Sequence, residues 1–227
     1  MIEIILMEPE TSGNVGAIAR VLKNFGFTNL TLINPKCKYL DLDALSRAKH
    51  AKDILKKAKI KPHSYLKNLP YLAATTAMLG NDYNLARSPV TPKELISSLK
   101  NKKGKLAILF GREGNGLTNE EINQADTIIH IPTSLKYQTL NVSQAVSILC
   151  YELSTSKPSE PFFPLATKKD KEIIEKSLFS ILDSLEFATK EKKQTQKTVW
   201  KRIFGKALLT RREAFAVLGL LKKLGKK

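Results

Sequence analysis

The chain has 227 residues, of which 42% are hydrophobic, so it is long enough for one α/β domain with a smaller appendage. Its formal net charge is +17, and the excess is not confined to one tail. Residues 1–156 carry 20 Lys and Arg against 13 Asp and Glu, and residues 157–227 carry 18 against 8. Such a density of positive charge favours a polyanionic partner such as nucleic acid, with a solvated lysine-rich surface as the alternative.

Cysteine content and hydropathy exclude several classes of protein. The two cysteines, Cys37 and Cys150, are too few for a disulfide framework or a zinc site, and Cys150 is expected to be a buried free thiol. No apolar run is long enough for a signal peptide or a membrane span. We therefore expect a cytoplasmic protein that uses no metal and contacts no membrane.

The first half of the chain alternates between strand and helix patterns. After the first strand, Val15, Ile18, Leu22 and Phe25 form one apolar helical face, and Gly26 provides the helix stop. The predicted elements are a strand at 2–7, this helix, a strand at 30–33, a helix over 45–58 with a basic outer face, and a strand at 71–78.

The alternation continues to about residue 153. Thr91 and Thr118 each begin a helix with a capping box, and Pro132 ends the strand before it because it lacks an N–H group. The predicted elements are a helix after Thr91, a strand at 106–110, a helix after Thr118, a strand at 128–131, an irregular loop at 133–140 and a helix over 141–153. This order predicts an α/β fold with a mostly parallel sheet and helices on both faces.

The last third of the chain differs in pattern. Three prolines between residues 156 and 164 indicate a linker, which we place at 157–166, between a domain at 1–156 and a small, basic, all-α domain at 167–227. Its first helix begins at Thr167, a polar basic run at 190–197 is expected to separate that helix from 199–204, and a capping box at Thr210 begins the last helix. Trp200 and Phe204 are expected to pack in its core rather than to stack on bases.

Three stretches combine polar side chains with predicted strand ends or helix starts. They read NVGAIAR at 14–20, FGREGNGL at 110–117 and IPTSLKYQTLNVSQAV at 131–146. In an open α/β sheet, a polar loop between a strand and a helix builds a ligand crevice at the strand ends. Arg20 lies opposite the apolar face of its helix, so it is free to point at a ligand or at another subunit.

In order and spacing these stretches resemble the three motifs of the SpoU/TrmH class of RNA ribose 2′-O-methyltransferases, in the SPOUT superfamily, and the run EPETSGNVGAIARVLKNFG is most similar to the TrmJ subgroup. The resemblance covers about the first 155 residues. It implies a C-terminal trefoil knot in the first domain, a homodimer, S-adenosyl-L-methionine as cofactor and tRNA as substrate. The implied target is a ribose of the anticodon loop (position 32, cytidine, with uridine as an alternative).

The resemblance also implies roles for individual residues. Arg20 matches the catalytic arginine, which we expect to clamp the phosphate beside the target ribose and to stabilise the developing alkoxide. Thr139 stands where the usual motif has serine, and Glu113 is expected either to take part in catalysis or to hold a loop through backbone N–H groups. The predicted catalytic residues are Arg20, Asn14, Thr139, Glu113 and Asn141. The predicted cofactor-binding residues are Thr75, Thr76, Ala77, Gly111, Gly116, Leu117, Ile131, Thr139, Leu140 and Asn141.

Three other functions are weighed against this one. A non-catalytic RNA-binding protein on the same fold would not need Asn14, Arg20, Glu113 and Asn141, and an enzyme acting on another RNA such as ribosomal RNA would keep them. A dinucleotide-dependent oxidoreductase would need a G-x-G-x-x-G loop after the first strand, where this chain has Gly13-Asn14-Val15-Gly16.

Overall fold

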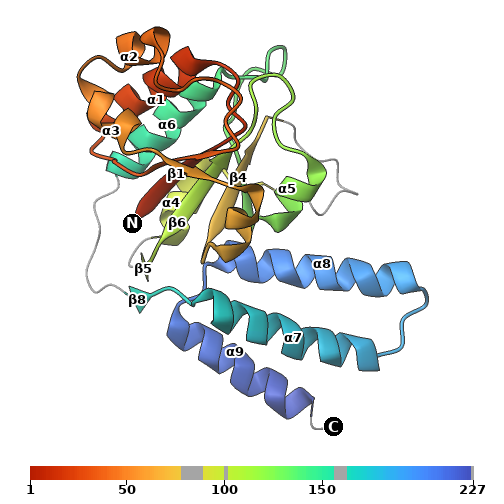
Figure 1. Ribbon diagram of the computed structural model, residues 1–227. Helices are drawn as coiled ribbons and strands as arrows, with labels where there is room; N and C mark the ends of the chain where they lie inside the picture. Colours follow the sequence, from red (N-terminus) through yellow and green to blue (C-terminus); the bar gives the residue numbers. More distant parts are fainter. Residues whose placement is uncertain (78–88, 100–101, 156–162, 226–227) are drawn as a thin grey trace.

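The structure is a computed structural model that describes residues 1–77, 89–99, 102–155 and 163–225. Its centre is a six-stranded sheet of order β3-β2-β1-β6-β4-β7, in which every neighbouring pair is parallel (Figure 1). The strands are β1 (Ile2–Met7), β2 (Leu30–Ile33), β3 (Lys59–Lys61), β4 (Leu72–Thr76), β6 (Leu106–Phe110) and β7 (Thr127–His130).

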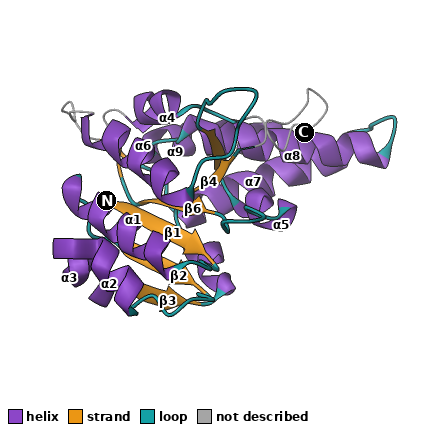
Figure 2. Ribbon diagram, turned by 90° about the horizontal axis from the view of Figure 1, so that it is seen from above, coloured by secondary structure: helices purple, strands orange, loops and turns teal. Residues whose placement is uncertain are grey.

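Helices cover both faces of this sheet, as predicted. Figures 1 and 2 show α1, α2, α3 and α6 grouped on one side of the sheet and α5 on the other. The helices of this part are α1 (Ser12–Asn24), α2 (Leu42–Ala48), α3 (Lys52–Lys56), α4 (Pro92–Leu99), α5 (Asn119–Gln124) and α6 (Val142–Thr155), with 3-10 turns η1 (Lys49–Ala51) and η2 (His63–Asn68).

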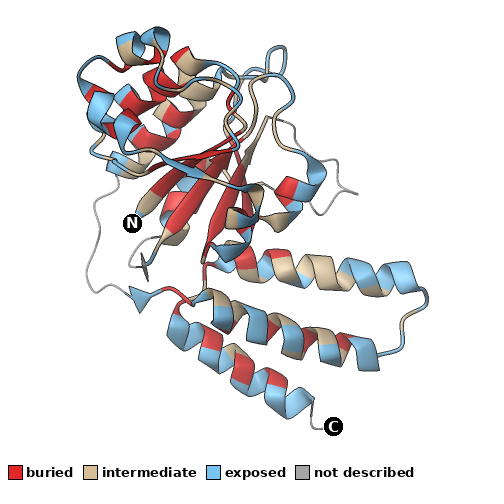
Figure 3. Ribbon diagram, viewed as in Figure 1, coloured by how far each residue is buried: buried red, intermediate tan, exposed pale blue. Residues whose placement is uncertain are grey.

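The strands are buried on both faces, because successive side chains of a strand point in opposite directions. Ile4 and Leu6 of β1 pack in the cluster that includes α1 and α6, whereas Ile5 and Met7 pack in the cluster that includes η2. Figure 3 shows the central strands buried along their length. The predicted α/β fold class is therefore confirmed, while the trefoil knot stays a prediction.

The predictions for residues 45–78 were wrong in two respects. The helix expected over 45–58 is broken at Lys49, whose φ of 50° is outside the helical range. Lys23 of α1 holds this break, since its ammonium donates to the carbonyl of His50 and to Asp53, both at 2.8 Å. The edge strand β3 was missed because it is short, lysine-rich and largely exposed, as edge strands often are.

The strand expected at 71–78 is Leu72–Thr76 in the structure, and Met78 lies outside the described residues.

The C-terminal region consists of three helices, α7 (Lys168–Ser184), α8 (Lys190–Ala207) and α9 (Arg211–Leu224), stacked below the sheet in Figure 1. The helix start predicted at Thr167 and the capping box predicted at Thr210 are both confirmed, and each residue forms a capping box. The basic run at 190–197, expected to separate two helices, is instead the first half of α8. It is held there by Lys193 and Lys197, which donate to Asp183 of α7 at 2.9 and 2.8 Å.

The helical region is attached to the sheet by polar and apolar contacts. The buried guanidinium of Arg202 on α8 donates to the carbonyls of Ala125 and Ile122 at the end of α5, at 2.9 and 3.2 Å. Lys171 on α7 pairs with Asp126 at 2.6 Å. Contacts of this kind hold the helices against the end of α5 that is remote from the glycine-rich loop.

Regular structure begins inside the segment expected to be a linker at 157–166. β8 (Phe163–Pro164) pairs in parallel with β5 (Lys102–Lys103), and Leu165 is buried in the main core. Residues 156–162 lie outside the described part, so the division at 1–156, 157–166 and 167–227 stays a prediction. No helix in the described part of the chain is both long and apolar enough to cross a membrane.

Candidate active site at the carboxyl ends of the strands

The sheet order brings two of the motif loops together. β1 and β6 are neighbours in register, with Leu6 opposite Phe110, so the loops that follow them begin side by side. From β1 the chain runs outward to β2 and β3, and on the other side of β1 lie β6, β4 and β7. Such a reversal point is where open α/β sheets bind ligands.

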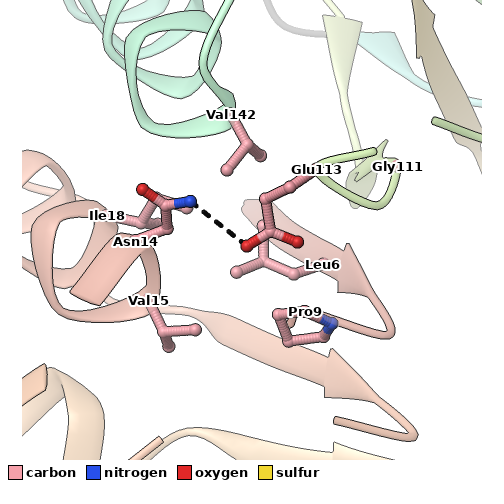
Figure 4. Close-up of a pocket in the computed structure, with 8 residues that line it drawn as sticks. All are labelled: Leu6, Pro9, Asn14, Val15, Ile18, Gly111, Glu113 and Val142. Atoms are coloured by element: carbon pink, nitrogen blue, oxygen red, sulfur yellow. Dashed lines mark hydrogen bonds between the residues drawn. The ribbon is translucent and has the colours of Figure 1, made fainter. Parts of the chain in front are cut away.

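Glu113 joins the loop after β6 to the loop after β1. One carboxylate oxygen accepts from the backbone N–H of Glu10 at 3.1 Å, and the other accepts from the N–H of Thr11 at 3.2 Å. The second oxygen also accepts from Nδ2 of Asn14 at 3.2 Å (Figure 4). These contacts are those that the loop-holding role expected for Glu113 requires, and both expected roles stay predictions.

Asn141 joins the third motif to the same place. Its Nδ2 donates to Oδ1 of Asn14 at 3.2 Å, and its Oδ1 caps α6 by accepting from the backbone N–H and the hydroxyl of Ser143 at 2.8 and 2.7 Å. Asn14, Glu113 and Asn141, three of the predicted catalytic residues, are thus linked in one chain of hydrogen bonds. Side chains around them, such as Ile18 and Val142, fill the narrow pocket in Figure 4, which has no room for a ligand.

Arg112 is a residue of this site that the sequence did not single out. Its guanidinium donates to Glu8 at 3.1 Å, to the carbonyl of Gly116 at 3.2 Å, and to both carboxylate oxygens of Glu121 at 3.0 and 2.8 Å. It thereby ties the loop after β1, the glycine-rich loop and the start of α5. Only its place inside the glycine-rich motif could have indicated a role, because Glu8 lies 104 residues away in the chain.

The ion pair of Arg112 and Glu121 shifts the pKa values of both groups. Burial by itself raises the pKa of Glu121, whose side chain is 4% exposed, but the hydrogen bonds from Arg112 and from the N–H of Thr118 outweigh it and lower that pKa. The hydrogen bonds to Glu121 raise the pKa of Arg112. We refer to Glu8, Asn14, Arg112, Glu113, Glu121 and Asn141 together as the loop network.

The residues predicted to bind the cofactor lie mostly at the ends of three adjacent strands. Thr75 and Thr76 end β4, Gly111 follows β6 and Ile131 follows β7. The hydroxyl of Thr75 donates to the carbonyl of Leu109 at 3.1 Å, so the ends of β4 and β6 are tied together. A Cβ at Gly111 would overlap the backbone of Gly116, so position 111 requires glycine.

The other predicted cofactor residues are placed around these strand ends. Gly116 has a φ of 65° and nothing within 4 Å of an added Cβ, so that side of the residue faces open space, while its N–H and carbonyl are bonded to the backbone of Arg112. Leu117 packs against the core on the η2 side, Ala77 and Leu140 are half-buried, and Thr139 is exposed. Among the described residues, no group of three His, Cys, Asp or Glu side chains is placed to hold a metal ion.

Arg20 is the one predicted catalytic residue that lies elsewhere. It faces an open hollow of about 460 Å³ between α1 and the end of α2, together with Arg47 and Lys49. The six-residue step from Asn14 to Arg20 turns the side chain by about 240° around the helix. The hollow and the pocket beside Glu113 therefore share no lining residue.

Comparison with known proteins identifies the family. Residues 1–151 match the family model described as the SpoU rRNA Methylase family. The chain belongs to this family. It is 38% identical to the tRNA (cytidine-2′-O-)-methyltransferase TrmJ of Methanocaldococcus jannaschii, over 98% of this chain and 99% of that protein. It is 29% identical to the tRNA (cytidine/uridine/adenosine-2′-O-)-methyltransferase TrmJ of Pseudomonas aeruginosa, over 97% and 92%.

Solved structures agree with this assignment. The crystal structure of TrmJ from Z. mobilis ZM4 superposes with a TM-score of 0.69 at 27% identity, covering all of both chains. An AdoMet-bound rRNA methyltransferase from Sinorhizobium meliloti superposes with a TM-score of 0.55 over 67% of this chain and 55% of that one, and at 17% identity it shows the fold alone. The full-length match to TrmJ includes the helical region as well as the sheet.

Proposed function

We propose that this protein transfers a methyl group from S-adenosylmethionine to the ribose 2′-hydroxyl of a nucleotide in the tRNA anticodon loop. The observation that carries the proposal is the hydrogen-bonded chain of Glu113, Asn14 and Asn141, which joins all three motif stretches at the carboxyl ends of the strands. The full-length similarity to enzymes named as tRNA 2′-O-methyltransferases supports tRNA as the substrate. The net charge of +17 supports it as well.

The residues at the strand ends fit S-adenosylmethionine. Gly116 leaves space for a ligand on its open side, and the half-buried Ile131 and Leu140 offer apolar surface for an adenine ring. Thr75, Thr76 and Ala77 would form one wall of the pocket, and Thr139 and Asn141 its mouth. When bound there, S-adenosylmethionine supplies an activated methyl group on a sulfonium.

The role of the loop network in this reaction is to fix geometry. Methyl transfer requires the ribose oxygen to lie in line with the methyl group, and most of the available rate gain is positioning. The carboxylate of Glu113 accepts hydrogen bonds from Glu10, Thr11 and Asn14, so we assign this residue to holding the loops at the correct separation. The amide of Asn141 is fixed in the same way by Asn14 and Ser143.

Arg20 is assigned to the RNA. Arginine side chains keep their positive charge at physiological pH and bind phosphate oxygens in a bidentate way. Arg20 would clamp the phosphate beside the target ribose and stabilise charge that develops on the oxygen. Because Arg20 and the loop network are on different sides of α1, a complete site would combine Arg20 of one subunit with the strand ends of a second copy, which makes a homodimer part of the proposal.

The test is methyl transfer from labelled S-adenosylmethionine to unmodified total tRNA, with the modified nucleotide then mapped. We expect 2′-O-methylation of an anticodon-loop nucleotide by the wild type. In Arg20→Ala the rate should fall by about 100-fold or more, the size of effect seen when a charge-stabilising group is removed. Lys56→Ala, which removes another exposed charge, serves as the control and should transfer at the wild-type rate.

The possible failures differ from one another. Binding of the methyl donor with no transfer to tRNA, but with transfer to ribosomal RNA, would replace the substrate and keep the reaction. No donor binding at all would leave a non-catalytic RNA-binding protein on this fold. Transfer that persists in Arg20→Ala would remove Arg20 from the mechanism.

A further inference from the structure

The hollow that holds Arg20 is built by close packing of α2 on α1. Two glycines of α1, one turn apart, face α2. A Cβ at Gly16 would overlap the backbone of Ala44, and a Cβ at Gly13 would come within 2.6 Å of Nε of Arg47. The lack of a side chain at Gly16 lets the end of α2 lie so close to α1 that Arg47 and Lys49 line the same hollow as Arg20.

The charges that line this hollow are all positive, and two of the three have no partner in the described part of the chain. Within the described residues, neither Arg20 nor Lys49 has an ion pair or a side-chain hydrogen bond. Arg47 is oriented by Asp43, which accepts from Nε at 3.0 Å, and the other guanidinium nitrogens have no acceptor among the described residues. None of the described residues lining the hollow is acidic.

A neighbouring lysine on α1 has a structural role and differs from Arg20 in having hydrogen-bond partners. Lys23, one turn after Arg20, is paired with Asp53 and also donates to a backbone carbonyl. That interaction holds η1 beside α1 and so keeps Lys49 in its unusual backbone conformation, with a φ of 50°. Backbone conformations of this kind persist where the surroundings enforce them, often at binding sites.

We propose that Arg47 and Lys49 complete, with Arg20, a binding site for a phosphate of the RNA backbone. This inference rests on the proposed function and adds two residues to the RNA-binding surface. Two guanidinium groups and an ammonium around one open hollow match the charge and hydrogen-bonding capacity of a phosphodiester. Ser46 and Asn24 at its edge add polar side chains. The site would hold the RNA strand in register so that Arg20 meets the phosphate next to the target ribose.

The test compares two double variants of the full chain that remove the same charge. Arg47→Ala with Lys49→Ala removes two of the three positive charges in the hollow, and Lys56→Ala with Lys57→Ala removes two exposed lysines outside it. Binding of fluorescently labelled tRNA is measured by anisotropy over a range of salt concentrations. We expect the hollow variant to bind tRNA at least about 10-fold more weakly and to reduce the slope of log K against log salt by up to about 1, since one phosphate contact contributes about 0.7 to 0.9.

The control variant should change the affinity less than about 2-fold, because exposed charges beyond the contact surface are screened by salt. Equal losses in the two variants would overturn the proposal, since the hollow would then be ordinary basic surface. A loss that follows dissociation of a dimer in light scattering would also overturn it, by showing that the hollow contacts a second subunit. Methyl transfer by the wild type is measured in parallel, so that failure of the proposed function is seen separately from failure of the hollow.

Discussion

The two ends of α1 differ in how completely their polar groups are partnered. At the start of the helix, Asn14 lies in the loop network, where Arg112, Glu113 and Glu121 each have partners within 3.2 Å. Farther along, Arg20 faces the hollow and has no partner among the described residues. The first arrangement fixes loops and the second leaves charge available for a ligand. Substitutions in the loop network should therefore lower the stability of the protein, whereas substitution of Arg20 should weaken its action on RNA.

The largest loss of stability is expected for Arg112→Ala. This change leaves the buried carboxylate of Glu121 without the guanidinium that pairs with both of its oxygens, with His63 at 3.5 Å as the remaining basic neighbour. Breaking such a pair costs about 3 to 5 kcal/mol. Chemical denaturation of the two proteins measures the difference. Arg47→Ala is the matched control, because its pair with Asp43 is half-exposed and should contribute about 1 kcal/mol or less. Equal losses in the two variants would mean that the network does not hold the loops.

A smaller loss is expected for Glu113→Gln, which keeps the shape of the side chain. Glutamine has one acceptor oxygen in place of two and no charge, so at least one of the donors on Glu10, Thr11 and Asn14 loses its acceptor. Hydrogen bonds to charged groups contribute about 1.5 to 3 kcal/mol, and partial exposure places this one near the lower value. The exposed Glu120→Gln is the control. No difference between the two midpoints of denaturation would argue against loop-holding by Glu113.

Mild acid should weaken the same network in a graded way. The pKa of Glu121 is lowered in the folded protein, so between its folded and ordinary values the unfolded chain binds more protons. Its contribution to stability is therefore present above the ordinary carboxyl pKa and is lost as the pH falls through the lowered one. Denaturation midpoints measured from neutral to acid pH should fall, and Glu121→Gln should flatten that fall. An identical pH profile in the variant would contradict this assignment.

Local sequence signals predicted part of this architecture correctly. The capping boxes at Thr118, Thr167 and Thr210 each need only residues three apart, and all are formed. The approach of Asn14, Glu113 and Asn141 was also foreseeable, because their motifs sit at strand ends and helix starts. Motif resemblance, rather than periodicity, supplied the residues themselves.

What the sequence could not predict depends on contacts between distant segments. Arg112 meets Glu8 only because β1 and β6 are neighbours in the sheet, although strands β2, β3, β4 and β5 lie between them in the chain. The break at Lys49 depends on Lys23, whose contacts with the 50–53 segment override the helical pattern of residues 45–58. The basic hollow follows from that break and from two glycines that face α2, and no pattern along the chain shows it.

The smallest effect on stability is expected where the effect on function is largest. Arg20→Ala removes an exposed side chain that has no partner among the described residues, and such surface changes alter stability by no more than about 0.5 kcal/mol. The double variant Arg47→Ala with Lys49→Ala should change stability as little as Arg20→Ala does, apart from the small contribution of the ion pair between Arg47 and Asp43. Thermal denaturation, measured alongside the transfer assay, would then show that the inactive variant has the same melting temperature as the wild type. If Arg20→Ala instead lowered the melting temperature as Glu113→Gln does, Arg20 would hold structure rather than RNA, and the contrast between the two ends of α1 would be lost.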